Sequence, residues 1–467
     1  MFTLQDQVWA GDRLRRREFL RVGSLALGGL SLSDLFAARA WAKARELPIK
    51  DKSVVFLFLH GGPSQFETFD PKMDAPSEIR SATGEVKTTI PGVSFGGTLK
   101  RLARLAHKFS VVRSFATGDG NHDIKPIVGK DSQQANLGSL YARLAGPLRT
   151  ETAMPTNIAL FPRAVSPEAG PAITSFGSFE SAGDLGAAYA PFVPGAGGGL
   201  QEDMRLNLPK ERLNDRRRLL QTLDQWNRWV DTHATALSLD AFQQQAFEAL
   251  ARGVSDAFDL SSEPARLLER YDTAPLVPKD RISKQWNNHP HYADHAATLG
   301  KLLLLARRLC ERGAGFVTVT TSFVWDMHAD VNNATMAEGM GYVGVPFDHA
   351  VSAFIEDVEE RGLRDKIMLV CCGEMGRTPR LNNNGGRDHW GNLAPLMIYG
   401  GGLKMGQVIG QSTRDGGEPA SDAITIPDLI ATIMHTLLDI GQVRVSQGLP
   451  RNLIETITRG RPIAGLV

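Results

Sequence analysis

The chain has 467 residues, of which 42% are hydrophobic, so it is long enough to bury a large core in one or two domains. Its 52 basic and 51 acidic side chains leave a formal net charge of +1, which gives no support for a nucleic-acid partner. The three cysteines, Cys310, Cys371 and Cys372, imply no disulfide framework, and buried free thiols are expected instead.

The N-terminal segment has the layout of an export signal. Three arginines at 15–17 precede Glu-Phe-Leu at 18–20, a Gly-rich apolar run covers 22–32, and small residues follow it at 38–44. This layout predicts a signal peptide over residues 1–44, and the paired arginines favour the twin-arginine export machinery, hence a periplasmic or extracellular protein. The alternative is a buried helix with a basic start. The apolar run is shorter than the about 20 residues that cross a bilayer, so no stable membrane span is expected.

Short apolar runs between helical stretches predict an α/β fold in a domain of residues 45–467. The expected strands cover 53–59, 110–113, 315–321, 367–372 and 395–400, and helices are expected at 296–312, 346–361 and from 426. Because strand, helix and strand alternate from 315 to 372, we expect a mostly parallel central sheet with helices on both faces. A charged, helical pattern at about 205–272 predicts an inserted helical hairpin.

Potential metal ligands gather where the predicted strands end, which is where open α/β sheets bind ligands. His60 follows the first strand, Asp326, His328 and Asp330 follow the strand at 315–321, and Glu374, Asp388 and His389 follow the strand at 367–372. In extended backbone Asp326, His328 and Asp330 would share one side. Carboxylates and imidazoles of this kind can hold a divalent ion. The alternatives are that His60 caps its turn, that Asp388 pairs with Arg377, and that His389 packs beneath the sheet.

Two other polar stretches are candidate sites. The loop 117–123 precedes a helical segment, so its backbone N–H groups can hold an anion, and Thr117, Asn121 or His122 could supply a nucleophile or a phosphate contact; it is also an ordinary turn sequence. The histidines of the stretch 289–295 do not have the spacing of a known ligand motif, so metal binding there is the less favoured interpretation.

Several short motifs of the sequence resemble those of a known family. They are the twin-arginine start, Gly-Gly-Pro-Ser at 61–64, Trp-Asp-Met-His at 325–328, Gly-Glu-Met-Gly-Arg-Thr-Pro at 373–379 and Gly-Arg-Asp-His-Trp at 386–390. Together they resemble an exported, sulfatase-like family known as domain of unknown function 1501. More distantly, the chain resembles the alkaline phosphatase-like superfamily, and the resemblance implies that fold.

The superfamily pattern implies one metal held by Asp326, His328 and His389. At the second metal the chain departs from the pattern: His60 replaces an Asp, Glu374 replaces another, and Met375 stands where a His would be. The sulfatase motif Cys-x-Pro-x-Arg is absent from the sequence.

The resemblance implies a hydrolase that uses a divalent metal ion, such as zinc, manganese or calcium, on phosphate or sulfate esters. Its partner would be a small anionic ester, for example a sulfated or phosphorylated carbohydrate. Arg377 would clamp the oxyanion through its planar guanidinium, and His122 or Thr117 would supply proton transfer or the nucleophile. The altered second metal site favours an alternative, an exported binding or scaffold protein that keeps the fold without catalysis.

Overall fold

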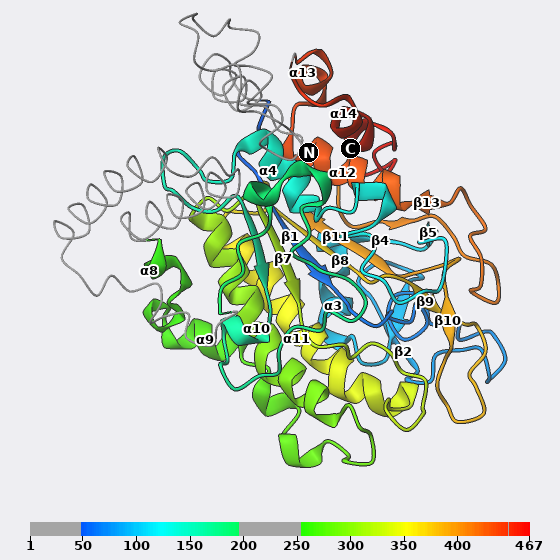
Figure 1. The fold of residues 1–467 in the computed structure, drawn as a ribbon. Helices are drawn as coiled ribbons and strands as arrows, with labels where there is room; N and C mark the ends of the chain where they lie inside the picture. The colour runs from blue at the N-terminus through cyan, green and yellow to red at the C-terminus, as the bar shows by residue number, and fades with distance from the viewer. Residues whose placement is uncertain (1–47, 196–253, 447) are drawn as a thin grey trace, which may run out of the picture. The chain divides into compact units, whose positions relative to one another are not determined.

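The computed structural model describes residues 48–195, 254–446 and 448–467 (Figure 1). The expected signal peptide at 1–44 and most of the expected helical hairpin at about 205–272 lie outside these residues. The strands are β1 (Ser53–Phe58), β2 (Glu85–Lys87), β3 (Ser94–Gly96), β4 (Phe109–Val112), β5 (Phe115–Ala116), β6 (Asn157–Leu160), β7 (Phe316–Thr320), β8 (Ile367–Cys372), β9 (Gly376–Arg377), β10 (His389–Trp390), β11 (Leu396–Gly400), β12 (Val408–Ile409) and β13 (Ile424–Thr425). The helices are α3 (Lys100–Leu105), α4 (Leu137–Ala145), α8 (Ser255–Phe258), α9 (Ala265–Tyr271), α10 (His289–Glu311), α11 (Met336–Glu360), α12 (Ile426–Leu437), α13 (Ile440–Val445) and α14 (Arg451–Thr458).

The central sheet has seven strands in the order β12-β4-β11-β8-β1-β7-β6. The strand β1 pairs in parallel with both β7 and β8, and β6 continues the parallel arrangement beyond β7. The strand β11 runs antiparallel to both of its neighbours, β4 and β8. The predicted mostly parallel sheet is confirmed, with β11 as the strand that runs against the others.

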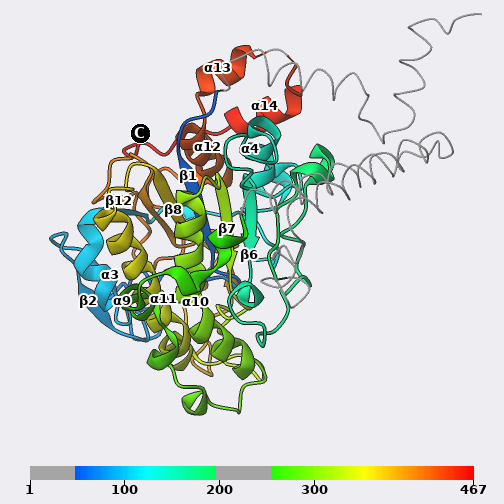
Figure 2. The same cartoon turned by 90° about the vertical axis from the view of Figure 1, so that its left-hand side faces the viewer.

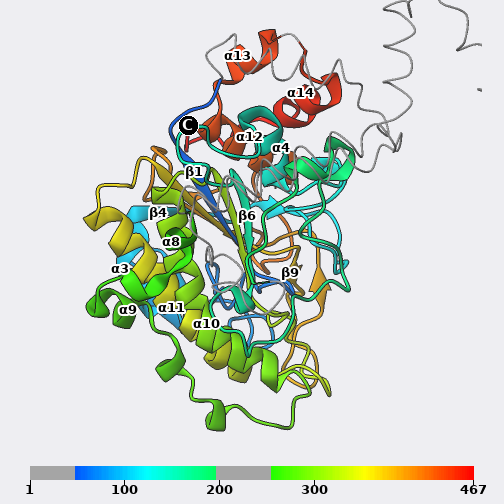
Figure 3. The ribbon, with the colours of Figure 1, turned by 60° about the vertical axis from the view of Figure 1, so that its left-hand side comes forward.

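Helices cover both faces of this sheet, as predicted (Figures 2 and 3). Side chains of a strand alternate between its two faces. On one face Val55 and Leu57 of β1 join the large apolar core formed with α10 and α11. On the other face the Phe56 ring stacks on that of Phe316, and α4 packs so closely there that a Cβ on its Gly138 would lie 2.8 Å from the Phe316 ring. The helix α12 contacts both β1 and α4.

The two long helices begin earlier than the sequence predicted. The helix expected at 346–361 begins at Met336, where the Thr335 side chain accepts a hydrogen bond from the Glu338 N–H at 3.2 Å, and Pro346 lies inside it. The helix expected at 296–312 begins at His289, because Pro290 falls in the first turn, where its missing N–H costs nothing. Within the described residues, no helix combines the length and apolar character that crossing a membrane requires.

Candidate metal centre

Several loops meet at one edge of the central sheet. Since β1, β7 and β8 are parallel, their carboxyl ends share that edge, and the loops that follow them carry Gly61, Asp326 and Glu374. The antiparallel strand β11 starts at the same edge, and the loop before it carries His389. The loop after β5 supplies His122, whose ring centroid lies 4.1 Å from that of His389. The topology therefore brings together residues that are far apart in the sequence.

The close approach of two of these loops requires a glycine. Gly61 has φ +115°, a conformation that L side chains rarely adopt, and a Cβ at this position would lie 2.6 Å from the backbone nitrogen of Asp326. The Gly-Gly turn after β1 thus lets the chain pass directly beneath the loop that carries Asp326.

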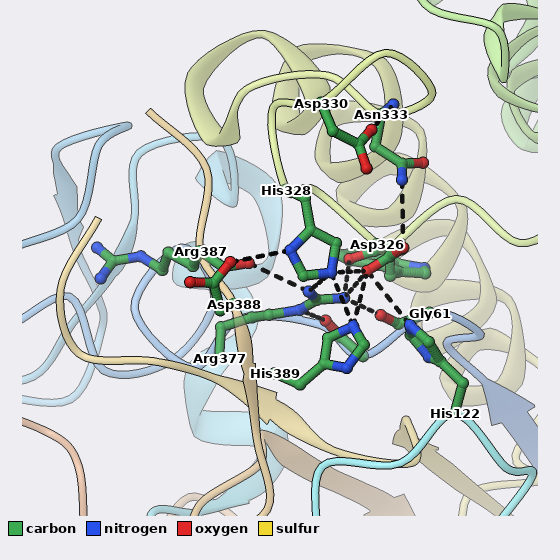
Figure 4. A network of polar contacts seen from close by, with 12 residues as sticks. Gly61, His122, Asp326, His328, Asp330, Asn333, Arg377, Arg387, Asp388 and His389 are labelled. Atoms are coloured by element: carbon green, nitrogen blue, oxygen red, sulfur yellow. Dashed lines mark hydrogen bonds and ion pairs between the residues drawn. The ribbon is translucent and has the colours of Figure 1, made fainter. Parts of the chain in front are cut away.

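Three imidazoles converge on one carboxylate oxygen (Figure 4). The Oδ1 atom of Asp326 lies 2.9 Å from Nε2 of His328 and 3.4 Å from Nε2 of both His122 and His389. One ligand atom from each of these four residues lies within 4.8 Å of the other three. No second cluster of three or more such residues occurs in the described parts of the chain. The four residues are named the metal-ligand group below.

The donor set of this group fits a divalent ion. The Nε2 atoms of His328 and His389 are only 2.7 Å apart, a distance at which two neutral imidazoles share one proton. The Nε2 atom of His122 is buried and has no hydrogen-bond partner among the described residues. A cation coordinated by the three nitrogens and the Asp326 oxygen would satisfy all of these atoms at once.

Two further carboxylates lie behind the histidines. Glu374 is fully buried, accepts the Gly61 N–H at 2.9 Å and lies 3.1 Å from Nδ1 of His122. Asp388 lies 3.1 Å from Nδ1 of His328, and its side chain is 63% exposed. A carboxylate that holds Nδ1–H leaves the Nε2 lone pair free to bind a metal. The prediction that Glu374 and Asp388 are themselves ligands does not match this geometry, since both contact the far side of a ring.

The charges around the group keep Asp326 ionised. Burial alone would raise the pKa of Asp326, but the Arg377 guanidinium, 2.7 Å away, and the three neighbouring histidines hold it well below its usual range. Burial would lower the pKa of His122, yet its contacts with Asp326 and Glu374 outweigh this and raise that pKa. Without a metal, these neighbours favour a protonated His122 beside two carboxylates.

Arg377 connects the loops of the site through its hydrogen bonds. It is fully buried, and its guanidinium donates hydrogen bonds to the carbonyl oxygens of Gly61, Gly62, Trp325 and Arg387 as well as to Asp326. Each of its three guanidinium nitrogens is therefore engaged by other described residues. The expected oxyanion clamp does not fit this arrangement. The alternative pairing with Asp388 is also wrong, because Asp388 contacts His328.

Thr117 and His60 lie outside the metal-ligand group. Thr117 is buried, and its backbone N–H donates to the Gly391 carbonyl oxygen at 3.0 Å, so it anchors the loop that carries His389. His60 is buried among the rings of Phe176, Phe179 and Phe323, and neither of its ring nitrogens has a hydrogen-bond partner in the described residues. This burial lowers the pKa of His60 to about 4. A strand-end position alone did not reveal that its ring turns into an apolar pocket.

Two further expectations are corrected by local backbone geometry. Asp330 was expected beside Asp326 and His328, but Ala329 has φ 56°, which breaks the alternation of side chains. Asp330 instead accepts the backbone N–H groups of Asn332 and Asn333 at 2.8 Å, while the Asn333 side chain donates to Asp326 at 3.2 Å. Asn333 is thus a supporting residue that sequence reasoning missed.

The histidine-rich stretch 289–295 forms the first turns of α10. His295 is buried, with Nδ1 2.8 Å from the Thr321 hydroxyl and Nε2 3.2 Å from the Val343 carbonyl oxygen. Both ring nitrogens of His295 are therefore satisfied within the core.

The fold and the site define an α/β protein with a candidate metal centre at the carboxyl edge of a mostly parallel sheet. The chain belongs to the family described as protein of unknown function, DUF1501, whose model matches residues 51–466. No curated protein matches the chain.

Solved structures with related shapes include three hydrolases. A sulfatase of Pseudoalteromonas sp. is 12% identical with a TM-score of 0.32, and the match covers 87% of this chain and 72% of that one. A phosphonate monoester hydrolase of Silicibacter pomeroyi is 10% identical with a TM-score of 0.31, covering 82% and 73%. The alkaline phosphatase of the Antarctic bacterium TAB5 is 12% identical with a TM-score of 0.26, covering 76% and 92%. At these TM-scores the likenesses establish neither the fold nor the activity of this chain.

Proposed function

We propose that this protein is an exported, metal-dependent hydrolase of phosphate or sulfate esters. The observation that carries the proposal is the convergence of three imidazole nitrogens on the buried Asp326 carboxylate at the sheet edge. The resemblance of the sequence to the alkaline phosphatase-like superfamily agrees with this chemistry. Of zinc, manganese and calcium, the imidazole-rich set favours zinc, since calcium takes six to eight oxygen ligands.

The ligand residues would be His122, Asp326, His328 and His389. When bound, a divalent ion supplies Lewis-acid activation of a phosphoryl or sulfuryl oxygen and of water. Glu374 fixes the ring of His122. None of the four ligand residues is hydrogen-bonded to a hydroxyl or thiol of the described chain, so water is the nucleophile that we propose.

The residues behind the ligands would orient them and keep Asp326 ionised. Arg377 keeps Asp326 ionised, as an anionic ligand must be. Asp388 contacts Nδ1 of His328 at 3.1 Å, so it orients this ring with Nε2 toward the proposed ion.

The N-terminal arginines support export by the twin-arginine route. That route carries proteins that are already folded, which suits the three buried free thiols of Cys310, Cys371 and Cys372. Replacing both Arg16 and Arg17 by lysine should leave the full-length protein in the cytoplasm, measured by cell fractionation. Unchanged recovery in the periplasm would exclude this route.

A metal count tests the proposed function. We expect one tightly bound divalent ion per chain in the purified protein and in the control variant His107→Ala, which changes an exposed histidine. The variants Asp326→Ala and His389→Ala should lose the ion and, with it, the hydrolysis of aryl phosphate or aryl sulfate. A parent protein without stoichiometric metal would overturn the proposal. An ion bound without turnover of either ester would favour the binding or scaffold protein instead.

A further inference from the structure

A cavity lies beside the metal-ligand group. Its volume is about 350 Å³, and it is bounded by the loop 119–134, the loop 176–181 and Ile426 of α12. Phe176 lines this cavity, and its ring centroid also lies 5.1 Å from that of His122. Phe176 therefore lies between the cavity and the metal-ligand group.

The polar side of the cavity is held in place by Lys125. The Lys125 side chain is 7% exposed, and its Nζ donates to Asp119 Oδ1 at 2.8 Å, to Asp123 Oδ1 at 3.0 Å and to the Asn121 carbonyl oxygen at 3.3 Å. All three ammonium donors are thereby engaged. The Asp119 and Asp123 side chains stay 45% and 46% exposed, so the cavity presents two fixed carboxylates as hydrogen-bond acceptors.

The lining has no net charge once its ion pairs are counted. It contains three carboxylates, those of Asp119, Asp123 and Asp131, and two ammonium groups, those of Lys125 and Lys130. Asp131 forms an ion pair with Arg459, so three negative charges face three positive ones. The cavity therefore suits an uncharged ligand better than an anion or an ammonium ion.

The remaining lining is mixed: four polar side chains, those of Ser132, Gln134, Ser178 and Ser181, accompany an apolar part. Phe176 supplies an aromatic ring, and Ile124, Val128 and Ile426 supply aliphatic surface. A ring that carries several hydroxyl groups matches both sides of such a cavity: its hydroxyls donate to the two carboxylates, and its C–H face packs on the aromatic ring.

We propose that this cavity binds the uncharged, polyhydroxylated part of an ester whose anionic group lies at the metal-ligand group. The proposal rests on the proposed function and adds the class of the leaving group, a sugar or similar polyol. Phe176, which contacts His122 on one side and lines the cavity on the other, then separates the two parts of the substrate.

The test measures binding without turnover, so that it is independent of the metal. The full-length protein is titrated by calorimetry with a panel of neutral mono- and disaccharides, with butylammonium and sulfate as charged probes. We expect saturable binding of at least one saccharide by the parent and by Asp326→Ala. Ser178→Trp, which fills the cavity from its lining, should weaken that binding at least tenfold, and Asp123→Asn, which preserves the shape of the cavity, should weaken it as well.

The matched control is Ser175→Trp, which places the same ring on an exposed position three residues away that does not line the cavity. It should bind the saccharide like the parent. The proposal is overturned if no saccharide of the panel binds, if Ser175→Trp loses binding as much as Ser178→Trp does, or if butylammonium binds in preference to every saccharide. Failure of the proposed function would appear separately, as missing metal in a protein that still binds the saccharide.

Discussion

Glu374 and Asp388 are two carboxylates in equivalent positions behind candidate ligands, and they differ in burial. From this difference we predict how much metal affinity is lost when each is replaced. Each lies 3.1 Å from the Nδ1 atom of a candidate ligand, His122 or His328, but Glu374 is fully buried while the Asp388 side chain is 63% exposed. Removing a carboxylate behind a metal-ligating histidine lowers metal affinity by about 10- to 100-fold, or roughly 1.4–2.8 kcal/mol. Since water and salt screen exposed charges, Glu374→Gln should cost about 100-fold and Asp388→Asn no more than about tenfold.

Both amide variants keep the size of the side chain, so the comparison isolates charge. Zinc affinity would be measured by competition with a chromophoric chelator at about 0.15 M and about 1 M salt, where the Debye length falls from roughly 8 to 3 Å. The loss in Asp388→Asn should shrink at the higher salt concentration, and the loss in Glu374→Gln should persist. An equal or larger loss for Asp388→Asn at low salt would refute the argument from burial.

Three other variants test buried side chains and a close backbone contact, each by urea unfolding in the presence of a chelator. Arg377→Met leaves the buried Asp326 carboxylate without its cation and should lower the free energy of unfolding by about 3–5 kcal/mol. Gly61→Ala places a methyl group 2.6 Å from the Asp326 backbone nitrogen and should cost about 1–3 kcal/mol in strain. Burial lowers the pKa of His295 from 6.5 to about 4, so the folded protein keeps this ring neutral where the unfolded chain protonates it. The free energy of unfolding therefore has its full value above pH 6.5 and decreases as the pH falls toward 4. This decrease is on the order of 3 kcal/mol, and His295→Gln should flatten the dependence of stability on pH in this window.

Matched controls separate these effects from the cost of substitution itself. Arg451→Met removes an arginine that is 93% exposed and should change stability by less than about 0.5 kcal/mol. Gly84→Ala changes a glycine at φ +72° with open space around its Cβ position, so about 1 kcal/mol of backbone cost is expected there without a clash. A control that loses as much stability as its partner, or a pH profile unchanged in His295→Gln, would contradict the corresponding argument.

The convergence of the loops could be predicted from the sequence because it depends on topology. Continuous apolar runs indicate buried strands, and parallel strands end at one edge of a sheet, so the proximity of Asp326, His328 and His389 follows. The sequence predicts proton transfer or nucleophilic attack for His122 and not metal ligation, because a loop without regular spacing gives no indication of where its side chains point. Its place among the possible ligands emerges only when the loop is folded.

The remaining differences arise from burial and local backbone geometry. Arg377 and His60 have residue types suited to catalysis and stand at strand ends, yet one is saturated by backbone carbonyls and the other is enclosed by aromatic rings. Sequence patterns describe which residues follow a strand but not the direction of each side chain. Ala329 shows the reason most directly, since one left-handed residue turns Asp330 away from Asp326.

The antiparallel direction of β11 has a consequence for how this protein can diversify. Residues Cys372 of β8 and Leu396 of β11 are direct partners in the sheet, so the whole segment 373–395 leaves and re-enters the fold at one point. A segment with such closely spaced ends can be exchanged as a unit, because loop length adds little to the free energy of closure. Replacement of the segment 373–395 alone could therefore change or remove the part of the site that it carries, while the sheet stays the same. A replacement segment must also supply a partner for the buried carboxylate of Glu67, which pairs with Arg387 of this segment.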